Sequence, residues 1–221
     1  MVGMNKQAGN MYPWVSHTWN PIRGKCPHDC SYCYMKRFKV GDLRLAEKEL
    51  GTDLGKGNFI FVGSSTDMFA KEVPAEWIHR VLLHCCAFDN TYLFQSKNPG
   101  RFLESLVFPP KTVFGTTIES NREYGLGKAP MRKFRHAAMK NLVGRKMISI
   151  EPVMDFDLSF FPNWIKEIQP EFVSIGADSK GHSLSEPDHE KVEELIRELE
   201  KFTEVKVKPN LKRLQRKVKG E

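Results

Sequence analysis

Short apolar runs alternate with longer amphipathic segments along most of the chain. Six runs rich in β-branched and aromatic residues predict buried strands at 14–19, 59–63, 91–95, 112–117, 147–150 and 172–175, and residues 205–208 predict a seventh. The segments between them predict helices at 75–88, 100–106, 129–143, 160–167 and 187–202. Strand, helix and strand in this order predict an α/β fold with a parallel sheet and right-handed crossovers.

The helix expected at 187–202 has the clearest boundary signals. It begins with Ser185-Glu-Pro-Asp-His189, which supplies capping residues and an early proline. Apolar residues then recur at helical spacing at Val192, Leu195, Ile196 and Leu199. The pattern predicts an amphipathic helix that covers a sheet, so the glutamate-rich outer face predicts a solvated surface and not a metal site.

Composition places the chain among enzyme-sized globular proteins. It has 221 residues, of which 40% are hydrophobic, enough for one substantial domain. No apolar run is long enough to cross a bilayer, so no membrane partner is expected. Residues 1–12 are polar without an apolar targeting core and predict a flexible arm, 13–211 the folded domain, and 212–221 a basic tail.

Three of the five cysteines lie in the segment Lys25-Cys-Pro-His-Asp-Cys-Ser-Tyr-Cys-Tyr34. They are too close together to join distant segments by disulfides, so we expect reduced thiols and a cytoplasmic location. Thiols at this density predict a metal site with Cys26, Cys30 and Cys33 as ligands. The residues alone allow a zinc site completed by His28 or His17, or an iron–sulfur cluster that leaves one iron open.

The spacing Cys-x3-Cys-x2-Cys resembles that of the radical S-adenosylmethionine (SAM) superfamily. The resemblance implies a [4Fe-4S] cluster held by the three cysteines, with the amino and carboxylate groups of SAM on the fourth iron. It implies that Tyr32, just before the third cysteine, lies against the adenine of SAM. It also refines the expected fold to a partial (βα)6 TIM-like barrel, open on one side.

Polar residues follow the predicted strands at the carboxyl ends, where parallel α/β folds place their chemistry. The strand at 59–63 runs into Gly63-Ser-Ser-Thr-Asp67, whose small side chains allow close approach of a ligand, although an Asx-type turn is the alternative. Lys97 follows the strand at 91–95 and offers a cation for a carboxylate, or is a surface lysine before a turn.

Carboxylates and a glycine follow the later strands. Glu119 and Glu151 come after 112–117 and 147–150, where either binds ribose hydroxyls or orients a substrate, or forms a salt bridge with neighbouring cations. Gly176 follows 172–175 and permits close approach of the backbone to a bound adenosine. Asp178 and His182 are candidate substrate contacts in the loop beyond it.

These strand ends resemble a phage and prokaryotic radical SAM family related to spore photoproduct lyase. The resemblance covers roughly residues 13–211 and rests on Trp19-Asn-Pro, Ser64-Ser-Thr-Asp67, Ser96-Lys-Asn-Pro, Ser149-Ile-Glu-Pro and Ile175-Gly-Ala-Asp178. It implies that Lys97 meets the SAM carboxylate and that residues 63–65 receive the amino end. The expected SAM-binding residues are Tyr32, Gly63, Ser64, Ser65, Asp67, Lys97, Thr117, Glu151 and Gly176.

The chain departs from this pattern in two ways. The Gly-Gly-Glu-like triplet of the superfamily is absent at 63–65, and no cysteine follows Cys86, whereas the lyase uses a late cysteine as hydrogen donor. Cys85 and Cys86 lie on the helix expected at 75–88, where core packing is expected. The resemblance therefore implies reductive cleavage of SAM, a 5′-deoxyadenosyl radical and an external electron donor, but leaves the reaction open.

The net charge of +7 is concentrated in two stretches. Residues 122–146 carry eight basic residues against the single acid Glu123, and residues 206–219 carry seven more. Such stretches favour a nucleic-acid partner, although a solvated helix face with a frayed end is the alternative. We expect a nucleic-acid base as substrate, with a nucleoside or a peptide as alternatives. A non-catalytic zinc or iron–sulfur protein that binds nucleic acid is the contrasting hypothesis.

Overall fold

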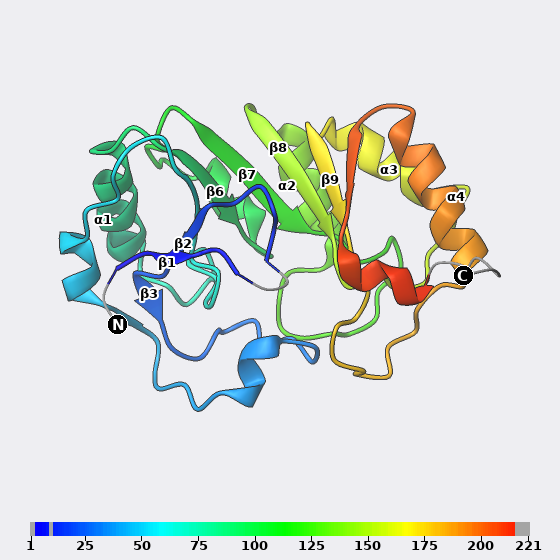
Figure 1. Cartoon of the computed structure of the whole chain (residues 1–221), viewed down its shortest axis with the longest axis horizontal. Helices are drawn as coiled ribbons and strands as arrows, with labels where there is room; N and C mark the ends of the chain where they lie inside the picture. Colours follow the sequence, from blue (N-terminus) through cyan, green and yellow to red (C-terminus); the bar gives the residue numbers. More distant parts are fainter. Residues whose placement is uncertain (1–2, 9–10, 215–221) are drawn as a thin grey trace.

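The computed structural model describes residues 3–8 and 11–214. One eight-stranded sheet has the order β1-β2-β5-β6-β7-β8-β9-β10. Its strands are β1 (Asn5–Lys6), β2 (His17–Trp19), β5 (Phe59–Val62), β6 (Thr91–Gln95), β7 (Thr112–Thr117), β8 (Arg145–Ile150), β9 (Phe172–Ile175) and β10 (Glu204–Val207). Every neighbouring pair from β2 to β10 is parallel, and β1 runs antiparallel to β2. The predicted partial, open barrel of parallel strands is confirmed (Figure 1).

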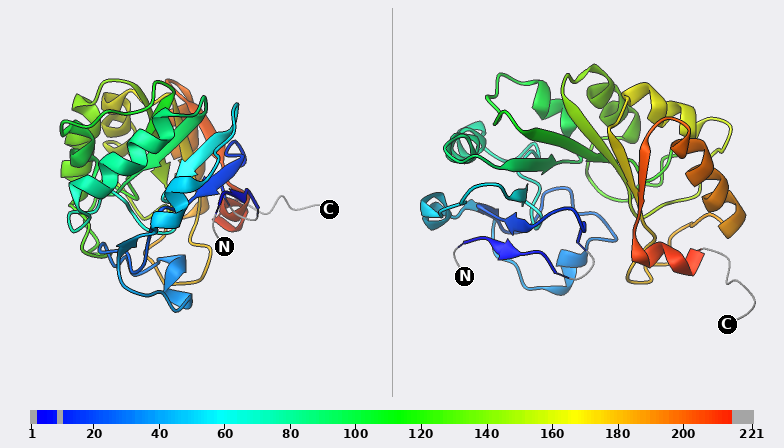
Figure 2. Two further views of the ribbon diagram at one scale, coloured as in Figure 1. Left: turned by 90° about the vertical axis from the view of Figure 1, so that its left-hand side faces the viewer. Right: turned by 45° about the horizontal axis from the view of Figure 1, so that its top comes forward.

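Four α-helices connect the strands along the outside of the curved sheet (Figure 2). They are α1 (Ala75–Cys86), α2 (Arg132–Asn141), α3 (Phe161–Ile168) and α4 (His189–Glu200). The cap expected for the last helix is present, because the Asp188 side chain accepts a hydrogen bond from the Lys191 N–H at 2.9 Å. Between β2 and β5, the chain forms η1 (Tyr34–Arg37), η2 (Glu47–Gly51) and the small antiparallel pair β3 (Ile22–Arg23) and β4 (Arg44–Leu45).

Several predicted boundaries are wrong, and prolines explain two of them. No α-helix forms at 100–106; the chain there makes the 3₁₀ helix η3 (Pro99–Leu103), and Pro109-Pro110 follows closely. The helix predicted to begin at Ala129 begins at Arg132, because Pro130 disfavours a helical conformation of the residue before it. The strand predicted at 14–19 is confined to β2, because a turn bonds the Val15 N–H to the Tyr12 carbonyl at 3.1 Å.

The N-terminal segment lies against the sheet where the structure describes it. Asn5 and Lys6 pair with Thr18 and His17, and Tyr12 is buried. The division into arm, domain and tail remains a prediction. Pro209–Leu214 forms a 3₁₀ helix, η4, and the rest of the predicted tail lies outside the described residues.

The apolar core lies between the sheet and the helices. Ile78 and Leu82 of α1 and Leu195 of α4 are buried against strand residues. Cys85 is buried as predicted, but Cys86 is exposed, because consecutive helical residues point about 100° apart. Among the described residues, no helix has the length and apolar character that a membrane span requires.

Candidate functional site

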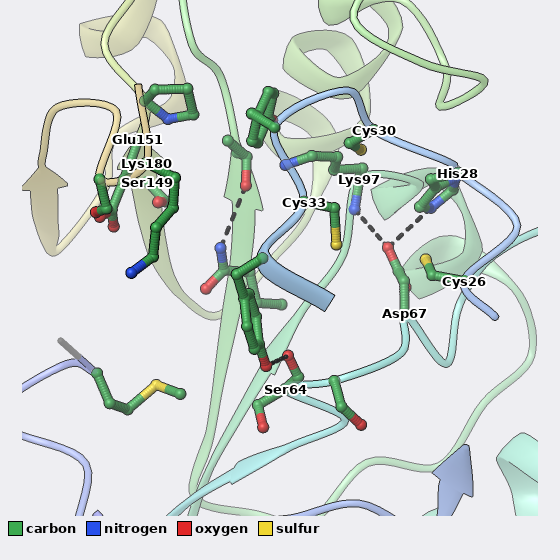
Figure 3. Close-up of a pocket in the computed structure, with 18 of the residues that line it drawn as sticks. Cys26, His28, Cys30, Cys33, Ser64, Asp67, Lys97, Ser149, Glu151 and Lys180 are labelled. Carbon is green, nitrogen blue, oxygen red and sulfur yellow. Dashed lines mark hydrogen bonds and ion pairs between the residues drawn. The ribbon is translucent and has the colours of Figure 1, made fainter. Parts of the chain in front are cut away.

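The carboxyl ends of the parallel strands meet at a cavity of about 600 Å³. All three clustered cysteines line it, with eight of the nine predicted SAM-binding residues: Tyr32, Gly63, Ser64, Ser65, Asp67, Lys97, Thr117 and Glu151. Figure 3 places the thiols on one side of the cavity and Ser149, Glu151 and Lys180 on the other. Residues that lie far apart in the sequence therefore share one site because parallel strands end at the same edge.

The cysteine loop, residues 26–33, is held by backbone hydrogen bonds. The N–H of Ser31 donates to Leu126 O, and the N–H of Lys128 donates to His28 O, both at 2.7 Å. Between these contacts, a Cβ on Gly127 would lie 2.6 Å from the His28 carbonyl oxygen, so only glycine fits there. The segment 126–128 therefore fixes the loop from outside.

The three cysteine thiols are partly buried. Burial, followed by the charge of Asp67, raises the pKa of Cys26 to about 11. Burial also raises the pKa of Cys30. A bound metal displaces such protons.

The donor set fits a cluster better than a single zinc ion. Within residues 3–8 and 11–214, no group of three or more His, Cys, Asp and Glu side chains is close enough to hold one ion. In a four-iron cluster, each thiolate binds a different iron, so three sulfurs need not converge on one point. His28, one of the two candidate fourth ligands of the alternative zinc site, donates from Nε2 to Asp67 Oδ2 at 2.8 Å.

Asp67 ties the cysteine loop to the ends of β5 and β6. Its Oδ2 accepts hydrogen bonds from His28 Nε2, from Ser96 Oγ at 3.0 Å and from the Lys97 N–H at 2.8 Å. Its Oδ1 accepts from the Phe69 N–H at 2.9 Å. Burial opposes the charge, but these donors, led by His28, lower the pKa of Asp67. The carboxylate thus positions the loop and the Lys97 backbone.

Ser64 and Ser65 face the end of β2. Asn20 Oδ1 accepts from the Ser65 N–H at 2.9 Å, from Ser65 Oγ at 3.0 Å and from Ser64 Oγ at 3.2 Å. The Tyr34 hydroxyl donates to the Ser64 carbonyl at 3.1 Å. Neighbouring parallel strands bring Asn20 to these hydroxyls, and both serines line the cavity.

Glu119 is a buried carboxylate surrounded by cations. Arg132 Nε lies 2.9 Å and Arg135 Nη1 3.2 Å from its Oε2, while Lys97 Nζ lies 3.6 Å from its Oε1. The Tyr32 hydroxyl donates to the same Oε1, and Lys97 Nζ lies 5.3 Å from the centre of the Tyr32 ring. Burial opposes ionisation, yet Lys97, Arg135 and Arg132 lower the pKa of Glu119 to about 2. Of its two predicted roles, Glu119 takes the salt bridge.

The opposite wall contains a row of neutral hydrogen bonds. The Tyr12 hydroxyl lies 2.9 Å from Gln95 Oε1 and 3.0 Å from Ser149 Oγ, and Gln95 Nε2 donates to Thr117 Oγ1 at 3.3 Å. Burial, followed by the charge of Glu151, raises the pKa of Tyr12, so its hydroxyl remains a donor. Thr117 therefore faces the cavity as part of a network.

Glu151 also forms an ion pair, with a residue near the end of the described chain. Lys208 Nζ donates to Glu151 Oε2 at 2.8 Å, and Asn210 Nδ2 donates to Oε1 at 3.0 Å. A Cβ on Gly176 would lie 2.9 Å from the Glu151 carboxylate, so this glycine makes room for that side chain. Gly176 itself does not line the cavity, although Ala177 does. Asp178 and His182, both in the lining, pair with each other at 2.6 Å.

The first basic stretch is largely neutralised by ion pairs. Five of its eight cations, Arg122, Arg132, Arg135, Lys140 and Arg145, pair with carboxylates. Lys146 is buried and donates to the Met139 carbonyl at 3.3 Å. The stretch therefore offers less free charge than its composition indicates, and its contact with nucleic acid remains a prediction.

Several lining or positioning residues were not predicted, among them Tyr12, Asn20, Gln95 and Lys208. Gln95 had a signal, because it is a polar residue at the end of an otherwise apolar strand. Asn20 stands in the Trp19-Asn-Pro motif, also at a strand end. Lys208 had the same kind of signal, because it ends the strand predicted at 205–208. Tyr12 had none, because tertiary packing alone brings it to the cavity.

Solved structures of spore photoproduct lyase share the fold. A double variant with bound AdoMet and dinucleoside spore photoproduct has a TM-score of 0.68 at 12% identity, over 93% of this chain and 80% of that one. A cysteine variant with the dinucleoside photoproduct gives 0.66 at 13% over the same shares, and a tyrosine variant 0.64 at 13%. No protein-family model and no curated protein matches the chain. At this identity, the similarity establishes the fold.

Proposed function

We propose that this chain is a radical SAM enzyme that acts on a nucleic-acid base or nucleoside. The observation that carries the proposal is that the Cys-x3-Cys-x2-Cys loop lines the same cavity as the polar ends of β5, β6, β7 and β8. The shared fold with a lyase whose structures contain AdoMet adds support that is independent of the motif.

Cys26, Cys30 and Cys33 would hold a [4Fe-4S] cluster, and the open iron would take SAM. When bound, the cluster supplies the electron that cleaves SAM to methionine and a 5′-deoxyadenosyl radical. The thiols give up their protons on binding, since burial keeps at least Cys26 and Cys30 protonated in the metal-free protein. The remaining cysteines, Cys85 and Cys86, lie on α1.

The charges around Lys97 suit the carboxylate of SAM. Three cations, Lys97, Arg132 and Arg135, face two carboxylates, Glu119 and Glu123, which leaves one positive charge. Lys97 is the member of this group that lines the main cavity. Glu119 holds Lys97 near Tyr32. The Lys97 ammonium would then bind the carboxylate of SAM, and the Tyr32 ring would pack against its adenine.

The rest of the cavity suits a polar substrate. A volume of about 600 Å³ falls within the range of small-molecule sites. Tyr12, Gln95, Thr117 and Ser149 offer hydroxyl and amide groups in the cavity lining. Such groups recognise the edge of a base or a sugar, and the dinucleoside bound by the structurally similar lyase supports this substrate class.

The test is anaerobic reconstitution with iron and sulfide, followed by addition of SAM and dithionite and assay of 5′-deoxyadenosine. We expect its formation in the wild type and its loss in Cys30→Ala. The matched control is Cys86→Ala, an exposed cysteine outside the cavity, which should retain activity. Intact SAM together with stoichiometric zinc would contradict the proposal and favour the non-catalytic binding protein.

A further inference from the structure

The outer side of the cysteine loop carries a surface rich in cations and exposed aromatic residues. It consists of Lys25, Lys36, Arg37, Lys39 and Lys128 with Tyr34, Phe38 and Val40, and we call it the outer patch. Phe38 is 50% exposed, an unusual state for an aromatic residue beside so many charges. Asp29 and Asp42 are the acids in the same part of the sequence, so positive charge dominates.

Three separate segments bring these cations together. Lys36 Nζ lies 3.0 Å from Asp29 Oδ1. The Lys128 N–H donates to the carbonyl of His28 at 2.7 Å, which places Lys128 beside Asp29. The Lys25 N–H also donates to the Gly41 carbonyl at 2.9 Å, which places Lys25 beside the end of the segment 34–41. The cations therefore surround the loop on its solvent side.

The patch is directly connected to the cluster ligands. Cys33 is the residue that precedes and caps η1, so the patch begins one residue after the third thiol. Both views in Figure 2 place η1 at the periphery of the molecule, away from the sheet. Tyr34 and Arg37 of the patch reach the cavity lining together with the three thiols, whereas its four lysines, Phe38 and Val40 do not. The patch thus begins at the rim of the cavity, and most of it lies outside.

The proposed reaction needs an electron from another molecule. Each cleavage of SAM consumes one electron, and the two cysteines outside the loop are too few for a second cluster. The donor must approach the cluster closely without entering the cavity that holds SAM and substrate. The outer patch is the exposed surface nearest to the thiols along the chain.

We propose that the outer patch is the docking surface for an acidic one-electron carrier protein. This inference rests on the proposed radical SAM function. Complementary charge steers encounter and exposed aromatic residues supply a small apolar centre, which suits the small, transient interfaces of electron-transfer partners. The carrier loses one electron and the cluster gains it, and no atom or proton is transferred at this surface.

A polynucleotide fits this patch less well than an acidic protein. Bases bind to such surfaces by stacking on free aromatic faces, but the Arg37 guanidinium already lies over the Phe38 ring, 4.9 Å from its centre.

The test measures binding of an acidic flavodoxin to the reconstituted protein by calorimetry at two salt concentrations. The Lys25→Glu/Lys39→Glu variant should weaken binding roughly tenfold or more and lose most of the salt dependence. The matched control is Lys56→Glu/Lys166→Glu, which makes the same charge change at exposed residues outside the patch. Its dissociation constant should stay within about twofold of the wild type.

A kinetic comparison separates docking from chemistry. Formation of 5′-deoxyadenosine with reduced flavodoxin should fall in the patch variant, whereas formation with dithionite, which needs no docking surface, should match the wild type. Unchanged flavodoxin affinity with intact dithionite-supported cleavage would overturn the docking surface alone. Loss of single-stranded DNA affinity, with flavodoxin affinity unchanged, would overturn it in favour of a polynucleotide. Absence of dithionite-supported cleavage in the wild type would overturn the proposed function and this inference with it.

Discussion

The two walls of the cavity are held together by different kinds of interaction. The cysteine wall comprises the cysteine loop with Asp67, Lys97 and Glu119, and it depends on buried charges. The far wall comprises Tyr12, Gln95, Thr117, Ser149, Glu151 and Lys208, and it depends on neutral hydrogen bonds with a single ion pair. Loss of one partner in a buried ionic network is costly, whereas loss of one neutral hydrogen bond is modest. The walls should therefore respond differently to substitution.

Replacement of Glu119 tests the charged wall most strongly. Glu119→Gln keeps the shape of the side chain but leaves Arg132, Arg135 and Lys97 without their shared carboxylate. The free energy of unfolding should fall by about 3–5 kcal/mol, the usual cost when one partner of a buried ionic network is removed. Urea unfolding monitored by circular dichroism measures it.

Glu151→Gln provides the matched comparison on the far wall. Its side chain is 18% exposed and has Lys208 as its cationic partner, so water can compensate part of the loss. We expect a clearly smaller decrease in the free energy of unfolding than for Glu119→Gln. Equal decreases in the unfolding free energy of the two variants would show that the cysteine wall does not depend more on buried charge than the far wall.

The pH dependence of stability should come largely from the same carboxylate. The pKa of Glu119 is about 2 in the folded protein against an ordinary value of 4.5. A carboxylate with a lowered folded pKa stabilises the fold above its unfolded pKa and loses that contribution as the pH falls. At about 1.4 kcal/mol per pH unit, roughly 3 kcal/mol should disappear between pH 4.5 and 2.

Urea unfolding of the wild type and Glu119→Gln across this interval checks the prediction. The curve of the variant should be flatter, because the amide does not titrate. A slope between pH 4.5 and 2 that is the same in both proteins would assign the acid sensitivity to other carboxylates, such as Asp67.

The same contrast explains how far the sequence predicted the site. The cysteine wall is built from residues within short motifs or at the ends of apolar strands, so spacing alone placed Cys26, Ser64 and Lys97 at one edge. Neighbouring parallel strands end together, and this needs no knowledge of side-chain packing. The parallel direction of the strands was also predictable, because strands and helices alternate along the chain.

The far wall was only partly predictable because chain ends complete it. Tyr12 comes from a segment whose polar composition predicted an arm. Lys208 ends the strand predicted at 205–208, but its charge was interpreted only as part of a basic stretch. The role of Gly176 was not predictable either. The room left by its missing side chain is occupied by the Glu151 carboxylate and is not part of the cavity. Such pairings depend on which distant side chains pack together, and the hydrophobic periodicity of the sequence does not predict them.

The smallest expected effect comes from Tyr12→Phe, which removes one hydroxyl from the far wall. The hydroxyl lies within hydrogen-bond distance of Gln95 Oε1 and Ser149 Oγ, so its loss should cost about 1 kcal/mol of unfolding free energy. The iron content after reconstitution should stay the same, because no cysteine contacts Tyr12 through these bonds.

Tyr92→Phe makes the same chemical change in the core, where the hydroxyl donates to the Cys85 carbonyl at 3.0 Å. Similar losses of stability with full iron content in both variants would mean that the far wall contributes to the fold without supporting the cysteine loop. A drop in iron content for Tyr12→Phe alone would mean that the two walls are coupled across the cavity, and that Gln95, at the end of β6 two residues before Lys97, transmits the effect.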